Sequence, residues 1–191
     1  MINAHVHVLT DRLDLRKTDP VGDLDDLFAI FSDPDGWWFD PDSRHTDRAR
    51  TRDWLTRAAA RFDEDGLSYW TVRRRDTGEI IGVGGAQRQR TGAWNLNYRL
   101  ATAHQGHGFA TELGRAAQTA ASVVDAAVPF IAWIAPQNAP SIKVAERLGL
   151  TNHGLHADPS DEQSRLAYAD RPLESGAWDA RAATPRAPGT R

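Results

Sequence analysis

The feature that most constrains this chain is the stretch at residues 104–121, HQGHGFATELGRAAQTAA, where a short glycine-containing loop runs directly into an alanine-rich helix. The first turn of a helix leaves backbone N–H groups unpaired and carries the positive end of the helix dipole, so it attracts anions. Gly106 and Gly108 lack the Cβ atoms that would hold a diphosphate away from this backbone. The stretch therefore predicts a phosphate-binding loop, with a plain turn as the alternative.

Two common phosphate-binding motifs do not fit this loop. No Gly-Lys-Ser/Thr follows the glycines, which excludes a Walker A loop. The run GHGFAT also lacks the last small residue of a dinucleotide-binding fingerprint, and no acidic residue ends a following strand at the required distance. The phosphate ligand must therefore be bound in another way.

The rest of the chain reads as alternating strands and helices of one α/β domain. Alternating apolar residues or short apolar runs predict strands at residues 6–17, 69–75, 79–89, 93–100, 128–135, 151–156 and 165–169. Helical spacing predicts one helix that starts at Asp19 and Pro20, one that Thr46 caps and that ends before Gly66, the alanine-rich helix, and a last helix that ends at Gly149. We expect a mixed, twisted central sheet of about six to seven strands flanked by about four helices.

Composition sets the limits of this domain. The 191 residues are 40% hydrophobic and 26% charged, which is typical of a soluble globular protein. We expect one domain over residues 1–180, followed by a disordered tail at 181–191, where Ala, Arg, Pro and Gly dominate.

Several classes of function are disfavoured by the same composition. With no cysteine, the chain has no thiolate metal site and no cysteine nucleophile, and we expect no metal. No apolar run reaches the ~18 residues of a membrane helix, and MINAHVHVLTDR does not resemble a secretory signal, so a cytoplasmic location is expected. The net charge of −3 gives no reason to expect a nucleic-acid partner.

Four motifs together resemble the GNAT superfamily of N-acetyltransferases. Residues 105–110, QGHGFA, resemble its Q/R-x-x-G-x-G/A loop, and LNYRL just before them resembles its GYxL strand. Residues 138–149 resemble its N-x-x-S-x-x-V-x-E-K-x-G-F helix, and residues 10–16, TDRLDLR, resemble the opening strand of its RimJ/RimL branch. The resemblance covers roughly residues 8–170 and implies a GNAT-like fold that uses acetyl-CoA.

The resemblance also implies a set of residues for the cofactor. Backbone amides from His107 to Ala110 would receive the pyrophosphate, and the main chain at residues 98–100 would pair with the pantetheine arm. Ser141 would lie beside the thioester sulfur. The cofactor-binding residues expected from the resemblance are Tyr98, Arg99, Leu100, Gln105, Gly106, His107, Gly108, Phe109, Ala110, Asn138, Ser141, Lys143 and Arg147.

The implied chemistry is direct attack of an amine on the thioester in a ternary complex, with a backbone N–H that stabilises the oxyanion. Ser141, Asn95 and Tyr98 are the expected catalytic residues, with Ser141 as the general acid. Two positions depart from the family: Asn95 replaces a frequent carboxylate, and Ala145 stands where many relatives have a tyrosine. Without a strong base, an α-amine or another weakly basic amine is the easier acceptor.

The acceptor pocket is expected between the first two helices, where two tryptophans lie among aspartates. The candidate acceptor-binding residues are Trp37, Trp38, Asp40, Asn95 and Asn97. The aromatic residues could equally pack their loop onto the sheet. The acceptor itself stays open between a ribosomal protein, an amino acid, a polyamine and an aminoglycoside.

Structural roles compete with several of these assignments. Asn138 could act only as a helix N-cap, Ser141 could be an ordinary helix residue, and Tyr98 could be core. The pair His5 and His7 resembles an amidohydrolase metal strand, but that fold needs a larger barrel. A non-catalytic acyl-CoA-binding module is the alternative function, because Asn95 cannot act as a base. Relatives commonly pair, so a homodimer is one possible assembly, and the oligomeric state stays open.

Overall fold

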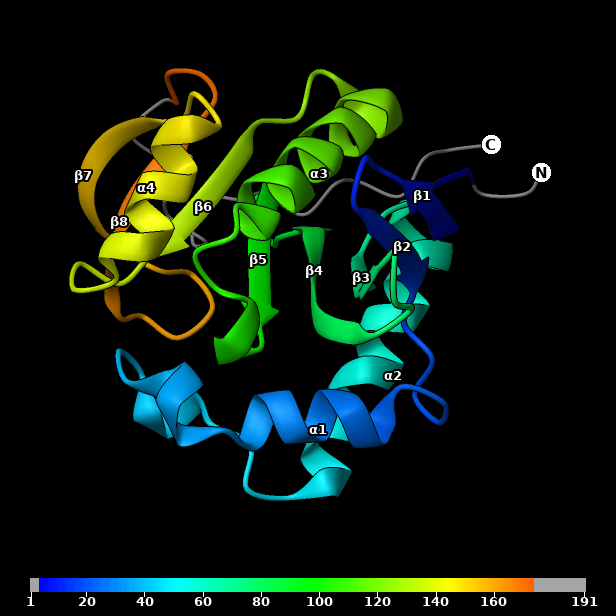
Figure 1. Ribbon diagram of the computed structural model, residues 1–191. Coiled ribbons are helices and arrows are strands. Elements are labelled where there is room, and N and C mark those ends of the chain that lie inside the picture. The colour runs from blue at the N-terminus through cyan, green and yellow to red at the C-terminus, as the bar shows by residue number, and fades with distance from the viewer. Residues whose placement is uncertain (1–3, 174–191) are drawn as a thin grey trace.

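The computed structural model describes residues 4–173, which form one mixed eight-stranded sheet in the order β1-β2-β3-β4-β5-β6-β8-β7 (Figure 1). The strands are β1 (His7–Leu9), β2 (Leu13–Lys17), β3 (Tyr69–Arg74), β4 (Ile80–Arg88), β5 (Trp94–Leu100), β6 (Phe130–Ile134), β7 (Thr151–Ala157) and β8 (Ser164–Ala169). The helices are α1 (Leu24–Ser32), α2 (Arg48–Asp65), α3 (Phe109–Asp125) and α4 (Ala139–Arg147), with short 3-10 turns η1 (Ala4–Val6), η2 (Pro34–Trp37), η3 (Pro41–Ser43) and η4 (Thr102–His104).

The helices cover the two faces of the sheet. Helices α3 and α4 lie on one face, and α1 and α2 lie on the other (Figure 1). Trp94, Leu96 and Leu100 of β5 are buried in the core under α3, as their alternation with polar residues predicts. A second core of α1 and α2 residues packs on Val83 and Tyr69.

Close approach between β4 and β5 depends on glycine. A Cβ atom at Gly84 would lie only 2.5 Å from Cβ of Tyr98 and 2.8 Å from Cδ2 of Leu113. Gly84 thus allows α3 to pack directly on the sheet and sets the height of Tyr98 above it.

The α/β class and the four flanking helices are confirmed, whereas the predicted boundaries need corrections. The sheet has eight strands rather than six to seven, because the predicted strand at residues 6–17 is a hairpin of β1 and β2 whose turn is closed by a hydrogen bond from Thr10 N to Leu13 O. The first helix begins at Leu24 rather than at Asp19. The cap of α2 is Asp47, whose carboxylate accepts from the Ala49 amide, rather than Thr46. The tail at 181–191 lies outside the described residues.

The sheet opens between its two central strands. Every neighbouring pair is antiparallel except β5 and β6, which are parallel and pair only at Trp94 with Phe130 and at Asn95 with Ile131. Beyond Asn95, β5 continues along β4 and β6 continues along β8, so the two strands diverge. Their facing backbone groups then have no strand partner, and such groups need another hydrogen-bond partner when covered. No helix within residues 4–173 is long and apolar enough to cross a membrane.

Candidate functional site

A cleft of about 830 Å³ lies where β5 and β6 diverge. It is bounded by the loop before α3, the first turns of α4, the segment between α1 and α2, and the loop between β7 and β8. The expected site residues that line it are Trp37, Trp38, Asp40, Asn95, Asn97, Tyr98, Arg99, Leu100, Gln105, Gly106, Gly108, Ala110, Asn138, Ser141, Lys143 and Arg147. Residues that are distant in sequence are thus brought to one cavity.

The glycine loop adopts a backbone conformation that favours glycine. Gly106 and Gly108 adopt φ values of 80° and 82°, in the left-handed region that disfavours any residue with a Cβ atom. A Cβ atom built on Gly106 would have no protein atom within 4 Å, so this position faces open space at the cleft. Gln105 shapes the loop, because its Nε2 donates to the Leu100 carbonyl at 3.2 Å.

Two of the predicted loop residues do not present their side chains to the cleft. The His107 ring turns back on the loop, with Nδ1 2.8 Å from the Gln105 carbonyl oxygen. Phe109, the first residue of α3, has its side chain buried in the core. Of these two residues, only the backbone groups remain candidates for contact with a phosphate.

The opening motif anchors the same loop from a distant part of the sequence. Thr10 Oγ1 donates to Glu112 Oε1 at 2.6 Å, and the Arg12 guanidinium pairs with Glu112 at 2.7 Å. Arg12 Nη1 also donates to the His107 carbonyl at 2.9 Å and stacks over the Phe109 ring. Burial acts to raise the pKa of Glu112, but the hydrogen bonds from Thr10 and Arg12 outweigh it, so the pKa is lowered. Glu112 therefore stays ionised in the first turn of α3, where the helix dipole favours negative charge.

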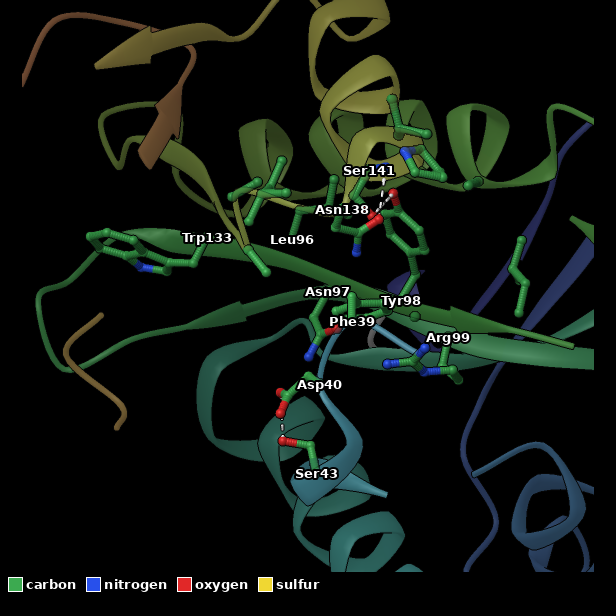
Figure 2. Close-up of a pocket in the computed structure, with 18 of the residues that line it drawn as sticks. Phe39, Asp40, Ser43, Leu96, Asn97, Tyr98, Arg99, Trp133, Asn138 and Ser141 are labelled. Carbon is green, nitrogen blue, oxygen red and sulfur yellow. Dashed lines mark hydrogen bonds between the residues drawn. The ribbon is translucent and has the colours of Figure 1, made fainter. Parts of the chain in front are cut away.

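Above β5, the start of α4 meets Tyr98. Asn138 caps α4, because its Oδ1 accepts from the Ser141 backbone N–H at 3.2 Å, which confirms the N-cap role. Tyr98 Oη donates to Ser141 Oγ at 3.1 Å, and Figure 2 shows the Tyr98 ring rising from β5 toward Ser141. Burial raises the pKa of Tyr98, so its hydroxyl stays protonated and able to donate. Ser141 is therefore part of a hydroxyl pair within the cleft.

The opposite side of β5 carries Arg99. Its guanidinium lies 3.6 Å from the centroid of the Trp37 ring and 5.1 Å from that of Phe39, and it donates to the Gly36 carbonyl. Burial lowers the pKa of Arg99 to about 10, against the opposing effect of the Asp40 charge. Arg99 is still a cation at neutral pH, held against an aromatic wall.

The segment between α1 and α2 both packs and lines the cleft. Trp37 is buried and donates from Nε1 to the Phe31 carbonyl at 2.7 Å, which is a packing role. Trp38 is 56% exposed at the cleft rim. Asp40 accepts from Ser43 Oγ at 2.7 Å, and Figure 2 shows Asp40, Asn97 and Arg99 on the same side of β5. Within this segment, Trp37 therefore packs the loop, whereas Trp38 and Asp40 lie at the cleft.

Asn95 lies at the point where β5 and β6 part. Its Oδ1 is buried and has no hydrogen-bond partner in the structure. A buried polar atom without a partner is uncommon in proteins, and it is expected where a ligand completes the site. Asn95 lines the cleft, but it cannot take up a proton as a carboxylate would.

Other lining residues had no sequence signal as site residues. His45 is buried, stacks on Phe31 with centroids 4.4 Å apart, and shares a 2.9 Å hydrogen bond with Thr51 Oγ1. Burial lowers the pKa of His45 to about 4, with the nearby charges of Arg50, Arg57 and Arg99 acting in the same direction. Trp54 packs against Phe31 and stacks on Tyr69, and both Trp54 and Tyr69 line the cleft.

The sequence and fold of this chain match a known protein family. A profile of the acetyltransferase (GNAT) domain matches residues 12–151, which include the glycine loop, both diverging strands and α4. The chain belongs to the GNAT acetyltransferase family. It is accordingly an acyltransferase, and the cleft between β5 and β6 is its candidate active site.

Individual relatives agree with this family. The chain is 29% identical over 152 residues to the uncharacterized protein YkkB of Bacillus subtilis, over 78% of this chain and 87% of that one. It is 28% identical over 165 residues to the uncharacterized N-acetyltransferase p20 of Bacillus licheniformis, over 82% and 89%. The fold matches that of RimL, a ribosomal L7/L12 α-N-protein acetyltransferase solved with coenzyme A, with a TM-score of 0.68 and 19% identity over 85% of this chain and 95% of that one.

The structure does not support an amidohydrolase metal strand at His5 and His7. His7 Nε2 lies 2.9 Å from Asp14 Oδ1 on an edge of an open sheet, and the described strands close no barrel. Within residues 4–173, no group of three or more His, Cys, Asp or Glu side chains is placed to hold a metal ion.

Proposed function

We propose that this acyltransferase transfers the acetyl group of acetyl-CoA to a primary amine, by direct attack in a ternary complex. The observation that carries the proposal is the opening between β5 and β6, directly beside a glycine loop at the start of α3. Acetyl-CoA, when bound, supplies an activated thioester. The complex of RimL with coenzyme A supports this choice of donor, within the limits of a shared fold.

The residues present fit such a molecule. The open space at Gly106 would admit a pyrophosphate to the backbone N–H groups of residues 107–110, which a Cβ atom there would obstruct. The unpaired edge of β5 at residues 98–100 would hydrogen-bond an amide-containing arm, and Asn138 would contact the same arm. Lys143 and Arg147 would lie near the nucleotide end.

We assign the proton donor to the pair Tyr98 and Ser141. The Ser141 hydroxyl accepts from Tyr98, so its own hydrogen is available for the sulfur that leaves. Tyr98 keeps its proton because burial raises its pKa. Tyr98 would therefore orient Ser141. The attacking amine loses one proton as the amide forms, and this proton, carried through solvent, would restore the hydroxyl hydrogen that Ser141 gives up.

The acceptor is proposed to be a weakly basic amine, such as an α-amine of a protein N-terminus or of a small molecule. An amine of pKa ~8 is about a tenth neutral at pH 7, a cost of ~1.4 kcal/mol, whereas a lysine amine of pKa ~10.4 costs ~4.6 kcal/mol. Asn95 cannot supply a base to offset the larger cost. Backbone N–H groups at the β5 edge remain available to polarise the thioester carbonyl.

The test is release of coenzyme A thiol from acetyl-CoA with a panel of amines and N-terminal peptides. We expect release that depends on an acceptor and that falls by about 10²-fold or more in Ser141→Ala, the usual contribution of a positioned acid. Ser122→Ala, on an exposed turn of α3, is the matched control and should keep wild-type rates. Acetyl-CoA binding without release for any amine would instead support a non-catalytic acyl-CoA-binding module.

Two further hypotheses from the sequence stay predictions. The first is a homodimer, which light scattering of the purified chain tests. The second is a cytoplasmic location, which cell fractionation tests.

A further inference from the structure

Arg99 is a buried cation with unused hydrogen-bonding capacity. Its Nη1 donates to the Gly36 carbonyl, whereas Nε is buried without a hydrogen-bond partner. A guanidinium carries five N–H donors in a rigid fork. The Nε–H is covered by protein atoms and one Nη1 hydrogen bonds Gly36, so the remaining Nη1 and Nη2 donors are the candidates for a ligand. Arg99 also lines the cleft, on the side of β5 away from Ser141.

No carboxylate among the described residues forms an ion pair with Arg99, although the Asp40 charge favours its cationic form. Asp40 influences it from a distance but accepts its hydrogen bond from Ser43. Asp158 and Asp161 are both bonded to the Arg165 guanidinium. Removing a cation from water without a hydrogen-bonded anionic partner is costly, which agrees with the lowered pKa of Arg99.

The second cation on this side is Arg50. It lines the cleft, and its guanidinium donates to the backbone carbonyls of Arg44 and Ser43 rather than to a carboxylate. The acceptor side of the cleft therefore presents two guanidinium groups that lack an ion pair with any described carboxylate. These two guanidinium groups would repel a simple cationic amine and attract an amine that also carries an anion, with Asp40 as the counter-charge on the same side.

We propose that Arg99 binds an oxyanion group, a carboxylate or a phosphate, on the acceptor, and that the enzyme prefers amines that carry such a group. The planar fork matches the two oxygens of either group. Trp37 and Phe39 hold the guanidinium in one orientation by stacking, so little side-chain entropy is lost on binding. This inference rests on the proposed function, because it names the substrate class of the same site.

The spacing along β5 limits the size of such an acceptor. Arg99 and Asn97 lie on the same face, two residues apart, which corresponds to roughly 6–7 Å along a strand. Asn95 lies a further ~6–7 Å along, where the strands part. An amine that reacts near Asn97 would thus have its oxyanion only a few bonds away. The α-carboxylate of an amino acid, a phosphate ester and an acidic side chain beside a peptide N-terminus all meet this requirement.

A purely structural role for Arg99 makes a different prediction. Its contacts with Gly36, Trp37 and Phe39 also fix the segment between α1 and α2 to β5. If that were its whole role, loss of the guanidinium would weaken turnover of every acceptor equally. A role in recognition would instead change the ratio between acceptors with and without an oxyanion.

The experiment measures kcat/KM for matched acceptors: glycine against glycinamide, phosphoethanolamine against ethanolamine, and peptides with N-terminal Ala-Glu against Ala-Gln. Rates are compared per neutral amine, so that differences in amine pKa do not enter. We expect the wild type to prefer the oxyanion in at least one pair by tenfold or more, and the preferred pair identifies the source. Arg99→Gln should remove most of this preference through KM, and Arg99→Lys should keep part of it.

Controls separate recognition from folding. Arg115→Gln, an exposed arginine on α3 outside the cleft, should keep the wild-type ratios. Thermal unfolding and acetyl-CoA titration check that each variant is folded, and the wild-type ratios test the inference even if Arg99 variants are unstable. Turnover without preference in all three pairs, or equal losses for both members in Arg99→Gln, overturns this inference alone. No turnover with any amine overturns the proposed function and this inference with it.

Discussion

Replacing Gly106 by alanine separates a backbone effect from a ligand effect at the glycine loop. Gly106 has φ 80° and a built Cβ atom that meets no protein atom within 4 Å. Gly78, in the turn between β3 and β4, has φ 75° and an equally open Cβ direction, but it lies outside the cleft. The two glycines thus share backbone strain and differ in what a ligand would meet.

The backbone effect on stability and the ligand effect on affinity have different expected sizes. Forcing alanine into the left-handed region costs ~1–2 kcal/mol at either position, so both variants should lose similar stability. At Gly106 the added methyl group also occupies the approach to the N–H groups of the loop. Loss of one hydrogen bond to a charged phosphate oxygen costs about 1.5–3 kcal/mol, which corresponds to roughly 10- to 150-fold weaker binding.

The assay is calorimetric titration of acetyl-CoA, with urea unfolding of the same samples. We expect Gly106→Ala to bind about 10- to 150-fold more weakly than the wild type and Gly78→Ala to bind like it. Wild-type affinity in a folded Gly106→Ala variant would refute the placement of the pyrophosphate at this loop. Equal weakening in both variants would show that general strain, rather than the cleft, controls affinity.

Three other results are expected. Tyr98→Phe should slow turnover, but the double variant with Ser141→Ala should be little slower than Ser141→Ala alone, because the two hydroxyls act as one unit. Losses in kcat that multiply in the double variant would contradict this coupling. The pKa of His45 is lowered to about 4, so the contribution of neutral His45 to stability is fully present above pH 6.5 and is lost as the pH falls toward about 4. This contribution amounts to at most about 3 kcal/mol. Urea unfolding measured against pH should show a smaller loss of unfolding free energy on acidification in His45→Gln than in the wild type, and an identical pH dependence would refute this prediction. Asn95→Asp should raise the rate on lysine-type amines more than on α-amines at pH 7, and a uniform change across the acceptor panel would argue against the missing-base argument.

Local patterns predicted most of the fold because the physical causes are local. The alternation of apolar and polar residues in β5 follows from side-chain direction along a strand. The predicted strand at 6–17 failed because apolar alternation does not reveal a tight turn, here closed between Thr10 and Leu13. Thr46 and Asp47 are both good caps, and only the observed contact with Ala49 distinguishes them.

The site residues also fall into those that local sequence motifs indicate and those that depend on tertiary packing. The loop, Asn138 and Ser141 lie in motifs of fixed spacing, so the sequence alone located them. The pairing of Tyr98 with Ser141 depends on how far β5 and β6 diverge, which no local pattern encodes. The stacking of Arg99 on Trp37 likewise depends on how the segment between α1 and α2 folds onto the sheet.

The most direct test of the account is the stoichiometry of one reaction. Wild-type protein is incubated with acetyl-CoA and an amine, and mass spectrometry counts the acetylated amine against the coenzyme A released. We predict one acetyl amide for each coenzyme A, with both products strongly reduced in Ser141→Ala. Coenzyme A released without any acetylated amine, or acetyl-CoA bound without either product, would contradict the assignment of this cleft to N-acetyl transfer.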